Sequence, residues 1–197
     1  YHARSWNFAA LGWRRSQESR VHTLVISTPD PELSGFMGKL KAENAAYARA
    51  KTAEAVDFSR AEISVEPDPV APGQTAIGVL MLSPLAISLM NKGKNGHRWH
   101  NNLNDVDLSG AVNHRLSRIT GSRVNLDVQA DRLYLRANPR HDVLIPVKEF
   151  PKGKRAFVIG MKAPLVLRGS EADLRLAWYA GIGEKTRGGF GCIGLVE

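Results

Sequence analysis

The sequence predicts an α+β protein, because segments with strand and helix patterns alternate along the chain. Apolar or alternating stretches predict strands over residues 21–27, 60–66, 76–83, 124–128, 133–137, 143–147, 155–161, 164–168 and 192–196. Helical patterns over residues 31–55 and 170–180 stand between them. Strands interleaved with two helices over about 100 residues favour a four-stranded sheet with helices on one face, the ferredoxin-like plan, which 197 residues could hold twice.

The two helices carry N-terminal signals. Asp30 supplies an N-cap and Pro31 a proline at the first helical position, and the apolar spacing that follows predicts a helix to about residue 55. Ser170 with Asp173 three residues on forms a capping-box pattern for the second helix. Between them, residues 66–74 carry three prolines and a glycine, so we expect an N-terminal domain over 1–68, a linker over 69–75 and a C-terminal domain over 76–197.

Charge and cysteine content narrow the function. The chain has 27 Lys and Arg against 19 Asp and Glu, a formal net charge of +8, which favours a polyanionic partner such as RNA, although solubility alone could also account for it. Cys192 is the only cysteine, which excludes an internal disulfide and a CxxC zinc or redox site and makes a reducing cytoplasm the expected setting. The apolar runs are too short to span a membrane.

The segment 91–123 is polar and basic. Asp107 or Ser109 can cap a helix in it that packs through Val112, Leu116 and Ile119. A tryptophan beside cations suits unpaired or looped RNA, so the RNA-binding candidates here are Lys92, Lys94, Arg98, Trp99, Arg115, Arg118 and Arg123. Near the N-terminus Trp6, Phe8 and Trp13 predict either a core strand or an aromatic platform for bases.

The segment 181–191 holds five glycines with Lys185 and Arg187. It follows a helix, which excludes the GxGxxG dinucleotide fingerprint, and Gly188 is followed by Gly-Phe, which excludes a P-loop. Gly181 could simply end the helix. Backbone N–H groups and two cations can also hold a phosphate backbone, so we predict RNA contacts from Gly181, Gly183, Lys185, Arg187, Gly188, Gly189 and Gly191.

The last 35 residues, 163–197, resemble the C-terminal region of the CRISPR repeat-processing endoribonucleases of the RAMP superfamily. Gly181, Gly183, Gly189, Phe190 and Gly191 match the motif GxGxxxxxGFG before the last strand, and the resemblance is fainter over 76–88. It implies tandem ferredoxin-like domains, the first lacking its first strand and helix, with 91–123 as a basic helical insertion in the second. That insertion most resembles the type IV subgroup.

The resemblance implies metal-independent cleavage of CRISPR precursor RNA at repeat hairpins, in which the RNA 2′-hydroxyl attacks the neighbouring phosphate and leaves a cyclic phosphate, with no cofactor. Histidine suits the general base, and the catalytic candidates are His97, His100, His2 and Arg187. The family's usual histidine lies in an early helix that the chain lacks. His22 is expected at a strand edge and His141 in a solvent-facing turn.

The pair His97 and His100 has no cysteine or carboxylate at ligand spacing, so no metal is expected. The implied partners are repeat hairpin RNA, the mature guide RNA and other CRISPR effector subunits. Three functions stay open: an endoribonuclease that remains bound to its product, a non-catalytic guide-RNA-binding subunit, and an oligomerising scaffold with a solvated basic face.

Overall fold

The computed structural model describes residues 5–15, 18–42, 47–49, 55–89 and 98–195. Its strands are β1 (Asn7–Arg15), β2 (Glu18–Ser27), β3 (Tyr47–Arg49), β4 (Ala55–Asp57), β5 (Ala76–Met81), β6 (Asp127–Ala130), β7 (Asp142–Glu149), β8 (Arg155–Met161), β9 (Leu165–Arg168) and β10 (Ile193–Leu195). Its α-helices are α1 (Pro31–Met37), α2 (Leu108–Thr120), α3 (Arg132–Ala137) and α4 (Glu171–Ala180). Short 3₁₀ turns are η2 (Leu103–Asp105), η3 (Pro151–Gly153) and η4 (Thr186–Gly188).

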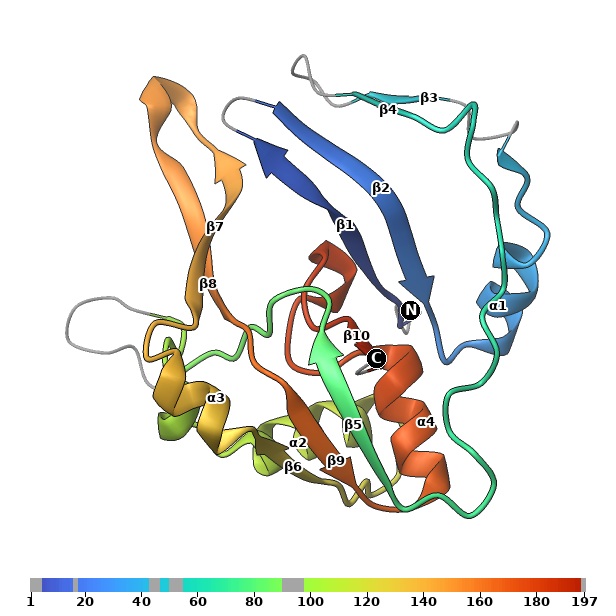
Figure 1. The fold of residues 1–197 in the computed structure, drawn as a ribbon, viewed down its shortest axis with the longest axis vertical. Helices are drawn as coiled ribbons and strands as arrows, with labels where there is room; N and C mark the ends of the chain where they lie inside the picture. The colour runs from blue at the N-terminus through green and yellow to red at the C-terminus, as the bar shows by residue number, and fades with distance from the viewer. Residues whose placement is uncertain (1–4, 16–17, 43–46, 50–54, 90–97, 196–197) are drawn as a thin grey trace.

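Residues from β5 to β10 form a ferredoxin-like domain, as predicted. The four strands pair antiparallel in the order β10-β5-β9-β6, and α2 and α4 make the two crossovers, β5-α2-β6 and β9-α4-β10. This is the β-α-β-β-α-β plan, with α3 and the hairpin β7–β8 added between its second and third strands (Figure 1). The helix α2, inside the segment predicted as a basic insertion, is thus a regular crossover element.

The core of this domain lies between one face of the sheet and the two crossover helices. Along β5, alternate residues point inward, because successive side chains of a strand face opposite sides. Val79 and Leu167 from the sheet, Val112 and Leu116 from α2, and Leu174 from α4 are all buried in one cluster. Full burial of such a side chain stabilises the fold by about 1.5 to 3 kcal/mol.

The N-terminal part is a hairpin, β1–β2, followed by α1 and the short hairpin β3–β4. The start of α1 is as predicted, since the Asp30 carboxylate accepts hydrogen bonds from the N–H groups of Glu32 and Leu33. The predicted extension to residue 55 is wrong, because β3 and β4 lie there. No residue of α1 is buried, so no apolar stripe supports a longer helix.

Three other local predictions are corrected. Residues 133–137 form part of α3 instead of a strand, because the Asp131 carboxylate caps Leu133 and Tyr134 and Leu135 turns into the core. Residues 60–66 form no strand. The strand expected at 124–128 begins at Asp127, since the preceding backbone is bonded to side chains of α2.

His141 is buried instead of solvent-facing. Its Nε2 accepts the N–H of Leu103 at 3.0 Å and its Nδ1 donates to the carbonyl of Asn138 at 3.1 Å, so the ring joins η2 to the end of α3. A turn with a proline predicts exposure from local sequence alone. The partner that buries this ring comes from 38 residues away in the chain.

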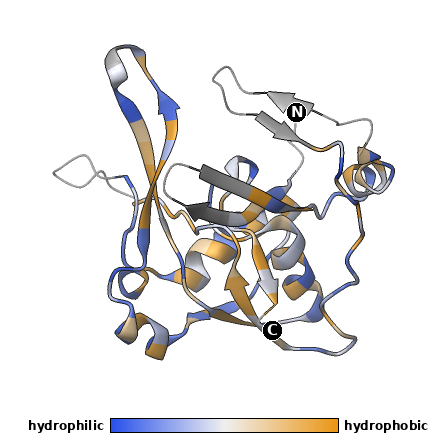
Figure 2. Ribbon diagram, turned by 45° about the horizontal axis from the view of Figure 1, so that its top comes forward, coloured by the Kyte–Doolittle hydropathy of each residue, from blue (hydrophilic) through white to orange (hydrophobic). Residues whose placement is uncertain are grey.

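The hairpin β7–β8 projects from the domain. Seven of the eight residues of β7 are exposed, including Leu144 and Val147. Figure 2 shows apolar and polar residues along both of its strands. Its base lies next to the end of the ferredoxin-like domain that carries the loop 181–191 (Figure 1).

Candidate functional site

The loop 181–191 doubles back on itself after α4 and is fixed to the edge of the sheet. The N–H of Ile182 donates to the carbonyl of Gly191, and the N–H of Gly191 donates to that of Pro84, both at 2.9 Å. The N–H of Glu184 donates to the carbonyl of Ala86 at 2.8 Å. These bonds place the two ends of the loop beside the segment that follows β5.

Two glycines of the motif are required by close backbone approach. A Cβ at Gly191 would lie 1.8 Å from the carbonyl oxygen of Ile182, and its φ of +72° suits glycine. A Cβ at Gly183 would lie 2.2 Å from a methyl carbon of Leu85 and 2.8 Å from the carbonyl oxygen of Ala86. Close packing inside the protein, and not approach to a phosphate, accounts for these two positions.

The other three glycines differ from one another. Gly181 is buried beside Asn7, and a Cβ at Gly189 would lie 2.9 Å from the ring of Phe8. Gly188 is exposed, and the atom nearest to a Cβ added there would be 3.9 Å away. Contact between RNA and any of the five glycines stays a prediction, and among them Gly188 has the open surface for it.

The two loop cations flank a buried residue. Lys185 and Arg187 are exposed, whereas Thr186 between them is 5% exposed. Lys185 adopts a left-handed backbone conformation with φ of +56°, and its Nζ lies 5.4 Å from the centre of the Trp99 ring, a cation-π contact. The loop therefore directs two positive side chains outward from a fixed backbone.

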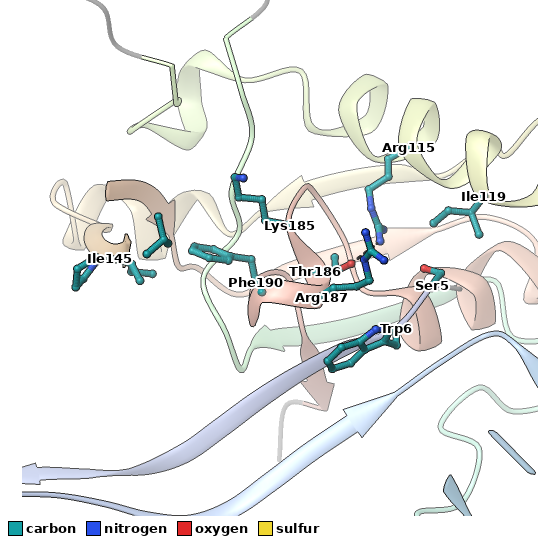
Figure 3. Close-up of a pocket in the computed structure, with 12 residues that line it drawn as sticks. Ser5, Trp6, Arg115, Ile119, Ile145, Lys185, Thr186, Arg187 and Phe190 are labelled. Carbon is teal, nitrogen blue, oxygen red and sulfur yellow. Dashed lines mark hydrogen bonds between the residues drawn. The ribbon is translucent and has the colours of Figure 1, made fainter. Parts of the chain in front are cut away.

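These cations border a cleft of about 930 Å³. The cleft joins four parts of the chain that are distant in sequence: the residues before β1, the outer side of α2, the middle of β7, and η4 with its flanks (Figure 3). Its lining residues are Ser5, Trp6, Arg115, Ile119, Ile145, Pro146, Val147, Lys185, Thr186, Arg187, Gly188 and Phe190. None of these described residues is acidic, and three are cationic.

Aromatic and apolar side chains form much of the cleft surface. The Trp6 ring stacks on Phe8 with centroids 5.6 Å apart, and Trp6 faces the cleft. Phe190, the aromatic residue of the GFG motif, is 2% exposed and packs with Ala86 and Val158 in a second core cluster. The cleft thus has a cationic rim at the loop and apolar walls on either side.

Arg115 lies beneath the loop cations. Its guanidinium donates to the carbonyls of Gly181 at 2.7 Å and Ala180 at 3.1 Å, and to the hydroxyl of Thr186 at 2.8 Å. Burial lowers the pKa of Arg115 to about 10, against a smaller raising effect of Glu184. The prediction that Arg115 reaches RNA directly is untested, and the contacts it makes here are with the protein.

The remaining predicted residues are placed in three ways. His2, Lys92, Lys94 and His97 lie outside the described residues. Trp99 is half-buried against the second core cluster, and the N–H of His100 donates to the carbonyl of Ile87. Arg98, His100, Arg118 and Arg123 are not among the residues that line the cleft.

Sequence reasoning missed the β7 wall and the role of Trp6 in the cleft. Ile145, Pro146 and Val147 read locally as an ordinary strand, and only the fold brings them opposite η4. The signal available for Trp6 was its alternation with Phe8 before a pair of arginines, which favoured a core strand over a platform for bases.

The sheet order and the glycine loop before its last strand define a ferredoxin-like domain. A family model described as CRISPR associated protein Cas6, C-terminal, matches residues 66–195, more than half of the chain. The chain therefore belongs to the Cas6 family. A search of curated proteins found no match.

Solved structures share the fold at low identity. The product of a Cas6-related gene from Pyrococcus furiosus is 14% identical over 98% of this chain and 79% of that chain, with a TM-score of 0.65. A RAMP protein binding different RNA substrates is 16% identical over 98% and 80%, also at 0.65. A Cas6 product complex is 18% identical over 98% and 82%, at 0.53. The predicted α+β fold with antiparallel sheets is thus confirmed and is consistent with tandem ferredoxin-like domains, whereas the type IV subgroup stays a prediction.

Among the residues that the structure describes, no group of three or more His, Cys, Asp or Glu side chains is arranged to hold a metal ion. No helix among them has the length and hydropathy to cross a membrane.

Proposed function

We propose that this chain binds CRISPR repeat RNA in the cleft between the β1–β2 hairpin and the ferredoxin-like domain. The observation that carries the proposal is the loop rim, where Lys185 and Arg187 project from a fixed backbone beside a cleft whose described lining contains no carboxylate. Cations that neutralise phosphates supply most of the affinity of nucleic-acid binding. The rim contacts the RNA backbone, which positions the RNA without reading its sequence.

The walls of the cleft suit the bases. Trp6 presents an aromatic face, and the β7 residues Ile145 and Val147 with Ile119 of α2 supply apolar surface. Unpaired RNA bases stack on aromatic rings, at about 1 to 3 kcal/mol per base by alanine substitution. Phosphates on the loop and bases toward Trp6 together form one continuous binding surface.

The finer proposal is cleavage of the bound precursor RNA by its own 2′-hydroxyl, without a metal. The negative charge that builds on the phosphorane needs cations, and Arg187 has the bidentate donors for it. The base and acid come from elsewhere, because no described lining residue is a histidine or a carboxylate. His2, His97 and His100 are the proposed sources, and an RNA-binding subunit without cleavage is the alternative.

One experiment tests both levels. Repeat RNA, 5′-labelled, is incubated with the protein in EDTA and analysed in parallel by mobility shift and by denaturing gel. Binding with cleavage to a 2′,3′-cyclic phosphate supports the endoribonuclease, and binding with intact RNA leaves the guide-RNA-binding subunit. Absence of a shift at moderate salt refutes both and leaves the oligomerising scaffold.

A charge-matched pair of variants locates the binding surface. Arg187→Ala removes a rim cation and should weaken binding about tenfold, with a salt slope lower by about one. Arg136→Ala removes an exposed cation of α3 that does not line the cleft and should bind as the unaltered protein does. An equal loss of RNA affinity in the two variants contradicts the assignment of the cleft as the RNA-binding surface.

A further inference from the structure

Arg115 has an unusual set of partners for an arginine. Its two terminal nitrogens donate to two carbonyls and one hydroxyl, all neutral acceptors. No ion pair within the described part of the chain involves Arg115. A half-buried guanidinium without a carboxylate in contact costs solvation energy, which its lowered pKa reflects. Its hydrogen bonds to the protein must offset this solvation cost.

The three partners of Arg115 belong to one structural feature. Ala180 ends α4, Gly181 follows it, and Thr186 begins η4. A single side chain therefore connects both ends of the turn that contains Lys185 and directly precedes Arg187. The last carbonyls of a helix lack partners within the helix. A cation there also interacts favourably with the helix dipole. The fork of Arg115 satisfies both carbonyls at once.

Thr186 is where this contact affects the rim. Its buried hydroxyl is held by Arg115, and its neighbours in sequence are the exposed Lys185 and Arg187. Lys185 is the one described residue other than glycine with a positive φ, a conformation that must be held by surrounding contacts. Fixing Thr186 therefore fixes the directions in which both cations leave the loop.

The charges also favour a role in RNA binding. Arg115, Lys185 and Arg187 line the same cleft, and three converging cations repel one another until a polyanion enters.

The loop has a second support, because the Glu184 carboxylate accepts hydrogen bonds from the N–H of Ser88 at 2.9 Å and from its hydroxyl at 2.5 Å. Arg115 is the support on the side of the cleft.

We infer that Arg115 is a positioning residue that sets the geometry of Lys185 and Arg187 for RNA, through Thr186 and the end of α4. The inference rests on the proposed RNA-binding function of the cleft. Arg115 acts mainly through its rigid, two-pronged geometry and not only through its charge, because lysine cannot reach three acceptors from one planar group.

The first test compares conservative variants that keep the charge. Arg115→Lys should weaken binding of repeat RNA about tenfold, whereas Arg136→Lys on α3 should leave it unchanged. Both variants are measured under conditions where circular dichroism shows them fully folded. RNA affinity of Arg115→Lys equal to that of the unaltered protein overturns the inference in favour of a charge effect.

A double-mutant cycle separates positioning from a general loss of packing. Thr186→Val replaces the hydroxyl with a methyl group and should lower RNA affinity severalfold. Its combination with Arg115→Lys should lower the affinity little more than Arg115→Lys alone. Independent, additive effects on affinity overturn the proposed route through Thr186.

Hydrogen exchange in the RNA-free protein makes the result independent of the proposed function. The Ile182 amide donates to the carbonyl of Gly191 across the loop, and the Gly191 amide donates to the carbonyl of Pro84. Both amides should exchange about tenfold faster in Arg115→Lys than in Arg136→Lys. If the unaltered protein does not bind RNA, the proposed function fails. Unchanged exchange shows that Arg115 does not order the loop, and faster exchange shows that it does, whatever the ligand.

Discussion

Substitution of Gly191 by alanine tests whether the glycine motif serves the fold or touches the ligand. The new Cβ would lie 1.8 Å from the carbonyl oxygen of Ile182 and 2.9 Å from its carbon, and these are backbone atoms that no rotamer change can move. The φ of +72° adds about 1 to 2 kcal/mol for a residue with a side chain. The loop must open to relieve the contact.

Opening the loop breaks two backbone hydrogen bonds, that from Ile182 to Gly191 and that from Gly191 to Pro84. Each is worth about 1 kcal/mol net. Gly191→Ala should therefore lower the free energy of unfolding by about 3 to 4 kcal/mol. The whole free energy of unfolding of a typical domain is only about 5 to 15 kcal/mol.

The matched control is Gly188→Ala, three residues away in the same loop. Its Cβ would have no neighbour nearer than 3.9 Å, and its φ is not positive, so stability should stay within about 1 kcal/mol of the unaltered protein. Urea unfolding followed by circular dichroism measures both variants. If Gly191→Ala is as stable as Gly188→Ala and loses only RNA binding, the packing role that we assign to Gly191 is wrong.

Three further predictions concern groups away from the cleft. Arg175 lowers the pKa of Asp68, and the N–H of Gly73 together with Arg175 lowers the pKa of Glu171. The ionised carboxylates therefore stabilise the fold above their ordinary pKa values of 3.8 and 4.5, and this stabilisation is lost as the pH falls below them. Arg175→Met should flatten the fall in melting temperature between pH 5 and pH 3, measured by calorimetry. Burial raises the pKa of the Cys192 thiol to about 12, so iodoacetamide at pH 8 should not label the folded protein, and rapid labelling contradicts its burial. His141→Ala leaves a buried N–H without an acceptor and should cost about 1 to 3 kcal/mol in urea unfolding, whereas an unchanged midpoint contradicts the buried contact.

Sequence predicted the parts of the fold whose signals are local and agree with one another. The helix α4 has a cap at Ser170, an apolar face at Leu174 and Ala177, and glycine after it, and it forms as predicted. Where local signals favoured different structures, tertiary contacts determined which one formed. Turn signals on either side of residues 133–137 favoured a strand, yet the cap at Asp131 and one buried side chain, Leu135, made the segment part of α3.

The site was predictable only in part, for a geometric reason. Composition and spacing singled out the loop cations and the glycine motif, because both lie within eleven residues. The cleft, however, is formed by segments up to about 180 residues apart. No local pattern predicts that Trp6 and Val147 will lie on the same cleft as η4. The same limit applies to Arg115, which has the pattern of a surface helix residue although its partners are more than 60 residues away.

The end of α4 explains why one short loop can determine the shape of the whole cleft. Two of its last carbonyls are satisfied by side chains from other elements: the Asn7 amide of β1 donates to Tyr179 at 2.9 Å, and Arg115 of α2 donates to Ala180. The N-terminal hairpin and the crossover helix are therefore attached to the same helix end, one turn before the rim cations begin. Because Phe190 closes the loop against Val158 of the β7–β8 hairpin, the third wall is fixed to the same point. A change at this helix end moves several walls relative to the cations, so variants here should alter RNA affinity more than their charge alone predicts.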